Sequence, residues 1–230
     1  MPQPRRVTPN QPALTALHAA TPSPDCPLCP RLAAFRAANR LAFSDWHNAP
    51  VPCFGPLDAP LLIIGLAPGL RGANRTGRPF TGDYAGQLLY ETLLKFGFAT
   101  GQYAERADDG LVLRHCRIVN AVRCVPPQNR PLPAEIVACN HFLAAERAAM
   151  PRLRAIVALG GIAHQAVLRA YGLRQNFAKF GHGRVTILPD GVVMTDSFHV
   201  SRYNTSTKRL TTAMFEAVIA AQAERLRQPD

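Results

Sequence analysis

The chain has 230 residues, of which 47% are hydrophobic, and a formal net charge of +11 at pH 7. This length suits one domain with a real core, and the charge predicts a polyanionic partner, with nucleic acid as the first candidate. No segment approaches the ~18 consecutive apolar residues of a membrane span, and residues 1–21 lack the apolar stretch of a signal peptide. We therefore expect a cytoplasmic protein without a membrane anchor.

Helices and strands are predicted to alternate along residues 26–228, which we expect to form a single domain after a proline-rich, flexible segment at residues 1–25. The apolar run at residues 59–66 (APLLIIGL) is typical of a strand buried on both faces. Proline marks the first turn of a helix at Pro133. In chain order we expect a helix at 31–43, a strand at 59–66, a helix at 84–96, a strand at 116–122, a helix at 133–149, a strand at 155–159, a helix at 162–171, strands at 184–188 and 192–195, and a helix at 205–227.

This alternation predicts an α/β fold, a three-layer α/β/α sandwich around a central, mostly parallel sheet of four to five strands. In such sheets, ligands bind beyond the carboxyl ends of the strands. The stretch from Gly65 to Asp83 follows the first strand, Asn120 lies in the second, and His199 follows the last. We therefore expect polar groups from distant parts of the sequence to meet at one edge of the sheet.

Four of the six cysteines form two pairs that suit a metal centre. Cys26 and Cys29 flank a Pro-Leu dipeptide, whereas Cys124 and Cys139 come much later in the chain. A close pair can hold one side of a metal centre while the fold brings the distant pair to it. Four thiolates suit zinc and a [4Fe–4S] cluster equally, and the spacing leaves both open. The other two cysteines, Cys53 and Cys116, stand alone, and we interpret them as plain thiols.

The loop from Gly65 to Asp83 is a candidate functional segment. Glycines after a strand often only make a turn, so Gly65–Gly69 alone is a weak signal. Its continuation is longer than most connections in a compact domain, and such loops are often functional. Asp83 is open to two interpretations, a functional acid or the N-cap of the helix that follows.

Three motifs occur in a fixed order with the four cysteines: GLAPG…NRTGRPFTGD at 65–83, NAVRCVPPQNRPLP at 120–133 and SFHVSRYN at 197–204. Together they resemble the iron–sulfur branch of the uracil-DNA glycosylase superfamily and are most similar to its family 5, or type B, enzymes. Family 4 enzymes begin the first motif with Gly-Glu-Ala-Pro, and Leu66 in place of that glutamate favours type B. The resemblance implies a monofunctional glycosylase that leaves an abasic site, acting on DNA that contains uracil or other deaminated bases such as hypoxanthine.

The resemblance also assigns a base pocket. A glycosylase flips its target base out of the duplex and binds it in a pocket. Phe80 would stack on the base, and the amide of Asn120 would offer a donor and an acceptor to a pyrimidine edge. Gly65, Ala67 and Asn204 complete the expected substrate contacts. The alternatives are a core phenylalanine at 80 and a turn-capping asparagine at 120.

His199 is the expected catalytic group that donates to the base oxygen as negative charge develops on the departing base. One such donor is typically worth about 3–4 kcal/mol. The alternative is a satisfied core histidine. Because Leu66 cannot position water, Asp83 is the acid expected to orient the water or to balance the positive sugar.

The remaining predictions concern DNA and metal. The segment Ser201, Arg202 and Tyr203 is expected to enter the minor groove, with Arg202 as a wedge. Candidates for phosphate contacts are Arg75, Arg78, Arg123, Arg130, Lys208 and Arg209. The resemblance favours a [4Fe–4S] cluster over zinc, as a structural tie without a redox step, and a monomer is expected. The rival hypotheses are a metal-stapled nucleic-acid-binding protein without catalysis and a dithiol redox protein that uses Cys26 and Cys29.

Overall fold

A five-stranded sheet forms the centre of the structure, a computed structural model that describes residues 21–228. The strands lie in the order β4 (Cys116–Asn120), β1 (Leu61–Gly65), β5 (Ala155–Leu159), β7 (Val193–Ser197) and β6 (Val185–Ile187). The first four are parallel, and β6 pairs antiparallel with β7. The predicted mostly parallel sheet is confirmed. Most of the segment predicted to be flexible, residues 1–25, lies outside the described residues.

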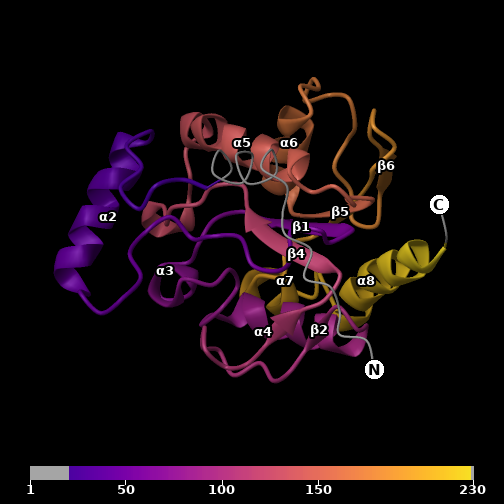
Figure 1. Ribbon diagram of the computed structural model, residues 1–230, viewed down its shortest axis with the longest axis horizontal. Coiled ribbons are helices and arrows are strands. Elements are labelled where there is room, and N and C mark those ends of the chain that lie inside the picture. Colours follow the sequence, from indigo (N-terminus) through magenta and orange to yellow (C-terminus); the bar gives the residue numbers. More distant parts are fainter. Residues whose placement is uncertain (1–20, 229–230) are drawn as a thin grey trace, which may run out of the picture.

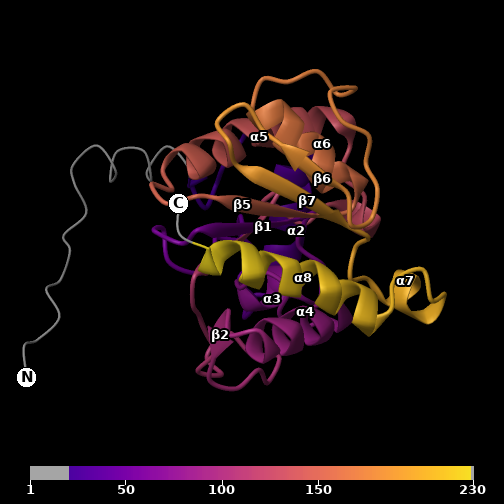
Figure 2. The same ribbon diagram turned by 90° about the vertical axis from the view of Figure 1, so that its right-hand side faces the viewer.

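Helices cover both faces of the sheet, as the apolar run of the first strand predicted (Figures 1 and 2). In β1, Leu61 and Ile63 pack against α4 (Tyr84–Lys95) and α8 (Thr212–Arg227). Leu62 and Ile64 face the opposite way, toward α5 (Pro133–Ala148) and α6 (Gly161–Ala170). Successive side chains of a strand point to opposite faces, so a continuous apolar run fills two cores. The three-layer sandwich is therefore confirmed.

One predicted helix is wrong in its extent. The stretch expected as one helix at 205–227 is divided between the end of a short helix, α7 (Arg202–Ser206), and the separate helix α8. Lys208 between them has a φ of 57°, which a continuous helix does not allow. The hydroxyl of Thr211 then accepts a hydrogen bond from the Met214 amide and caps α8. As a result α7 protrudes from the body of the molecule (Figure 2).

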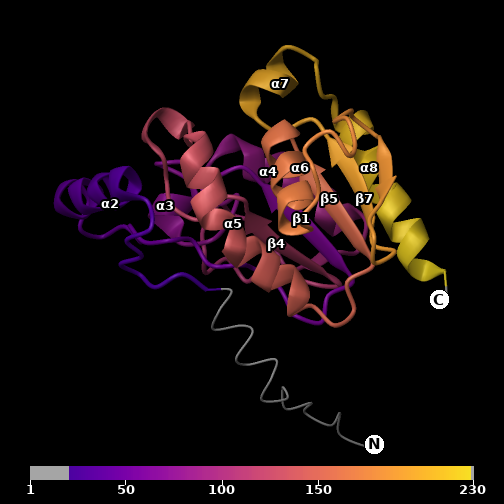
Figure 3. The ribbon, with the colours of Figure 1, turned by 90° about the horizontal axis from the view of Figure 1, so that it is seen from above.

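Several small elements carry little sequence signal. They are α3 (Ala73–Thr76), the two-stranded hairpin of β2 (Ala99–Thr100) and β3 (Val112–Leu113), and a 3-10 turn at Pro127–Asn129. The predicted N-terminal helix is present as α2 (Pro30–Ala42) and lies at the end of the molecule remote from α8 (Figure 3). An ion pair of 2.7 Å between Arg31 and Glu135 ties α2 to the start of α5. Among residues 21–228 no helix is long and apolar enough to cross a membrane.

Candidate active site

A small cavity lies where the strands β1 and β4 end and the chain leaves β7. Three segments that are far apart in sequence form it: the 65–83 loop, the end of β4, and the segment after β7. Its lining residues are Ala67, Pro68, Gly69, Ala73, Phe80, Asp83, Ala85, Asn120 and His199. The convergence predicted for the carboxyl edge of the sheet is therefore observed. Its volume is about 40 Å³, more than the roughly 10–15 Å³ that one water molecule needs.

A larger cavity of about 590 Å³ lies at the opposite edge of the sheet, beside Pro60, Phe98, Arg152 and Arg154. It contains none of the predicted site residues. We place the active site in the smaller cavity, because unsatisfied polar groups and an aromatic wall converge there.

Phe80 forms an apolar wall of the active-site cavity. Its side chain is only 7% exposed, and its ring lies against Gly65, the last residue of β1. A Cβ atom at residue 65 would lie 2.5 Å from Phe80 Cζ and 2.4 Å from Asn120 Oδ1. Both distances are far below van der Waals contact, so only glycine lets these two groups come together. Gly65 therefore shapes the pocket through its lack of a side chain.

Asn120 presents an unsatisfied amide oxygen to the cavity. The residue is 4% exposed, and its Oδ1 atom finds no hydrogen-bond partner among the described residues. A buried polar atom without a partner costs on the order of 1–3 kcal/mol, so proteins rarely keep one without a use. This acceptor is therefore available to a ligand.

Asp83 occupies the N-cap position of α4, but its side chain forms no capping hydrogen bond within the described chain. The carboxylate lies beside Gly69 and Gly72, and its Oδ1 is a second buried oxygen without a partner there. Burial raises the pKa of Asp83, although the amides of Ala85 and Gly86 partly oppose the shift. Asp83 thus lies at the N-cap of α4 and also lines the cavity, and both interpretations of the residue are compatible with this position.

His199 faces Phe80, with ring centroids 6.1 Å apart and an angle of 29° between the planes. Burial of the imidazole lowers the pKa of His199 to about 4, so the ring is neutral at pH 7. The Nδ2 atom of Asn204 donates to the His199 carbonyl oxygen at 2.8 Å. Asn204 does not line the cavity in the described structure. Its side chain supports the histidine segment, where we had expected a substrate contact.

The predicted DNA-contacting segment forms a protruding surface beside the cavity. Ser201 caps α7, Arg202 is exposed, and Tyr203 is 71% exposed. The Arg202 guanidinium lies over the ring of Tyr84, 5.8 Å from its centroid. Arg75 on α3 is also exposed. These positions suit contacts with a DNA backbone.

Two of the arginines predicted to contact phosphates are buried in the structure. Arg78 is 4% exposed and forms a two-bond ion pair with Asp109, with distances of 2.7 Å each. Arg123 is 2% exposed and lies 3.5 Å from the carboxylate of Glu146. Both guanidinium groups lie in the protein interior and pair with carboxylates there. Sequence alone does not distinguish a buried, paired arginine from a surface one.

The four predicted cysteine ligands line one small cavity between α2, the segment after β4, and α5. All four are free thiols: Cys26, Cys29 and Cys124 are partly buried and Cys139 is buried. The buried guanidinium of Arg36 donates to the Cys124 sulfur at 3.4 Å. A cation beside these thiols fits a centre built of negative thiolates. Among residues 21–228 no group of three or more His, Cys, Asp or Glu side chains is arranged to hold one metal ion.

Fold and site define a class of protein: a mostly parallel α/β domain that brings an aromatic ring, an amide and a neutral histidine together beside a short helix with an exposed arginine. The sequence model of the uracil DNA glycosylase superfamily matches residues 52–222. A Type-5 uracil-DNA glycosylase of Thermus thermophilus is 44% identical over 206 residues, which cover 87% of this chain and 93% of that protein. A Type-5 enzyme of Pyrobaculum aerophilum is 39% identical, over 86% and 88%. A Type-4 uracil-DNA glycosylase of the same organism is 35% identical over 54% of this chain. The chain belongs to the uracil-DNA glycosylase superfamily, and the resemblance to type 5 is confirmed.

Sequence reasoning missed the residues that support Phe80. The hydroxyl of Tyr90 on α4 donates a hydrogen bond to the carbonyl of Pro79, the residue before Phe80. The hydroxyl of Tyr103, in the loop between β2 and β3, donates to the carbonyl of Phe80 itself. Tyr90 stands at an ordinary core position of its helix. Tyr103 and Asp109 lie in a polar loop outside every motif, so no local signal identifies them.

Proposed function

We propose that this protein is a monofunctional DNA glycosylase that hydrolyses the N-glycosidic bond of uracil in DNA and leaves an abasic site. The observation that carries the proposal is a pair of buried oxygens, Asn120 Oδ1 and Asp83 Oδ1, in one cavity with Phe80 and His199. Neither oxygen has a hydrogen-bond partner among residues 21–228. The Type-5 relatives, named as uracil-DNA glycosylases, support it.

Base recognition uses the wall and the amide. A flipped uracil stacks on the ring of Phe80. Its ring N–H donates to Asn120 Oδ1, and the amide nitrogen of the same side chain donates to a base carbonyl. This satisfies the buried acceptor and reads a pyrimidine edge at the same time.

Bond cleavage uses the neutral histidine and the acid. The bond between the sugar C1′ and the base nitrogen breaks, and its electron pair leaves with the base. His199 donates a hydrogen bond to the base oxygen that becomes negative. The Asp83 carboxylate orients a water, whose oxygen bonds to C1′ and keeps one proton as the new sugar hydroxyl. The other proton of this water ends on the departing base anion. The products are the free base and an abasic sugar.

The finer substrate range is proposed from the first motif. Leu66 stands where family 4 enzymes carry a glutamate and does not line the cavity in the described structure, so this position brings no charged group to the base. We expect hypoxanthine and other deaminated bases to be accepted beside uracil. A monomer that acts on chromosomal DNA in the cytoplasm completes the proposal.

The four cysteines would hold a [4Fe–4S] cluster, with zinc as the less favoured occupant. The single cavity that they line and the adjoining Arg36 support this choice. Such a cluster would supply a structural tie between Cys26 and Cys29 of the N-terminal segment and Cys124 and Cys139, which lie after β4 and in α5. Hydrolysis transfers no electrons, so no step passes through it.

The test uses labelled duplexes with one G·U, G·hypoxanthine or G·T pair, followed by alkali to cut abasic sites. We expect cleavage at uracil and hypoxanthine by the parent and strong loss by His199→Ala. Both proteins should retain equal binding to an uncleaved duplex. Binding without any cutting by the metal-loaded parent would instead support a binding protein without catalysis.

A further inference from the structure

The backbone of Phe80 has a conformation that needs support. Its φ is 52°, in the left-handed region that non-glycine residues rarely adopt. The residue follows Pro79 and is buried against Gly65. A ring meant to stack on a base must keep a fixed plane, so the contacts that hold this backbone bear on the site.

Two tyrosine hydroxyls hold the carbonyls on either side of this turn. Tyr90 donates to the Pro79 oxygen at 2.5 Å, and Tyr103 donates to the Phe80 oxygen at 3.2 Å. The two tyrosine rings pack together, with centroids 4.7 Å apart. Burial raises the pKa of Tyr103 to about 12, so its hydroxyl keeps its proton and remains a donor.

Helix α4 closes the remaining side of the Phe80 carbonyl. A Cβ atom on Gly86 would lie 1.8 Å from the Phe80 oxygen and 2.3 Å from the Tyr103 hydroxyl. The carbonyl is therefore enclosed between α4 and residues 101–111, which we call the hairpin loop.

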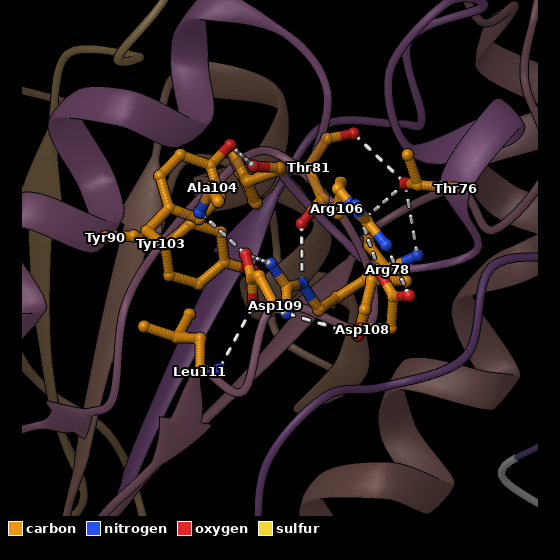
Figure 4. Close-up of polar contacts among 12 residues, drawn as sticks. Thr76, Arg78, Thr81, Tyr90, Tyr103, Ala104, Arg106, Asp108, Asp109 and Leu111 are labelled. Carbon is orange, nitrogen blue, oxygen red and sulfur yellow. Dashed lines mark hydrogen bonds and ion pairs between the residues drawn. The ribbon is translucent and has the colours of Figure 1, made fainter.

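The hairpin loop is fastened to the motif segment by a buried ion pair (Figure 4). Asp109 accepts two bonds from Arg78 and one each from the amides of Ala104 and Leu111. Arg78 donates in turn to the hydroxyl of Thr81 at 2.8 Å. The carboxylate thus fixes the shape of its own loop and holds the two residues that flank Pro79–Phe80.

We propose that the hairpin loop positions the base-stacking wall, with Tyr103 and Asp109 as positioning residues that fix the main chain of Phe80. The proposal rests on the base-stacking role of Phe80 proposed above. Neither residue lines the cavity in the described structure, so both act through the backbone that they hold. The loop is therefore part of the glycosylase apparatus although it lies outside the motifs.

The decisive variant is Tyr103→Phe, which removes one hydroxyl and keeps the ring beside Tyr90 and Arg78. The single-turnover rate of uracil excision from a G·U duplex should fall about threefold to tenfold, as expected for one neutral hydrogen bond. The inhibition constant of free uracil should rise by a similar factor, because the pocket itself is less ordered. Binding to a duplex with an abasic-site analogue should stay unchanged.

Asp109→Asn should lower the single-turnover excision rate and raise the inhibition constant of free uracil, each by more than Tyr103→Phe does. Its matched control is Asp108→Asn in the same loop, where an exposed carboxylate pairs with the exposed Arg106. The control should behave like the parent in excision, uracil inhibition and melting temperature.

If Tyr103→Phe kept the parental excision rate and the parental inhibition constant for free uracil, the positioning role would be overturned. A fall in melting temperature and rate with unchanged uracil inhibition would also overturn it, because the loop would then be only structural. Phe80→Ala separates this failure from that of the proposed function. If Phe80→Ala retained parental excision, the base-stacking role of Phe80 would be refuted. If Phe80→Ala lost excision while Tyr103→Phe kept it, only the positioning role of the hairpin loop would be refuted.

Discussion

Replacing Gly65 with alanine tests the pocket with a single methyl group. The new Cβ would lie 2.5 Å from Phe80 Cζ and 2.4 Å from Asn120 Oδ1. Carbon atoms at optimal contact are about 3.5–4.0 Å apart, so the wall and the amide must move by about 1 Å. A misplacement of that size can lower a rate about 100-fold. Overpacking of a core by such a group costs about 1–3 kcal/mol of unfolding free energy.

The assay for Gly65→Ala is single-turnover excision of uracil, with thermal unfolding as its companion. We expect a rate loss of about 100-fold and a melting temperature lowered by roughly 2–4 °C per kcal/mol. Gly181→Ala is the matched control, because its Cβ would meet only the flexible Arg184 side chain, at 3.3 Å. If Gly65→Ala excised uracil at the parental rate, the pocket geometry would be refuted, because Phe80 and Asn120 would then tolerate a side chain at residue 65.

Three further predictions concern protonation, metal and DNA. The pKa of His199 is lowered to about 4 from 6.5, so between these values the unfolded chain binds more protons, and stability is lost as the pH falls from about 6.5 toward 4. Urea unfolding at pH 5 and pH 7 should therefore show a smaller pH difference in His199→Gln than in the parent, and equal differences would refute the shift. Cys139→Ser should lose bound iron and visible absorbance while Cys53→Ser keeps them; equal iron in both would remove Cys139 from the ligand set. Arg202→Ala should weaken duplex binding and reduce the slope of affinity against salt by about 1, whereas Arg169→Ala on α6 should leave the slope unchanged.

The sequence predicted the parts of the site that follow directly from strand ends. Gly65, Asn120 and His199 are found at one edge because parallel strands bring their carboxyl ends together. The apolar run of β1 likewise predicted a sheet covered on both faces. Both features can be predicted from the local hydrophobic pattern and from the order of strands and helices along the chain.

The interior pairing of arginines could not be predicted. Arg78 lies in a motif that is rich in polar residues, and its partner Asp109 comes from a separate hairpin. Only the assembled fold brings the two together. The positive φ of Phe80 is similarly a tertiary effect, because nothing in a phenylalanine favours that conformation.

The order in which the site is assembled along the chain has a consequence for synthesis. Phe80 and Asn120 emerge from the ribosome well before His199, and α8, which covers one face of the sheet beside α4, comes last. All four thiols that line the cysteine cavity precede His199 and α8 in the chain. The cavity at the carboxyl edge of the sheet therefore cannot form until the segment after β7 has been made, because that segment supplies His199 to its lining.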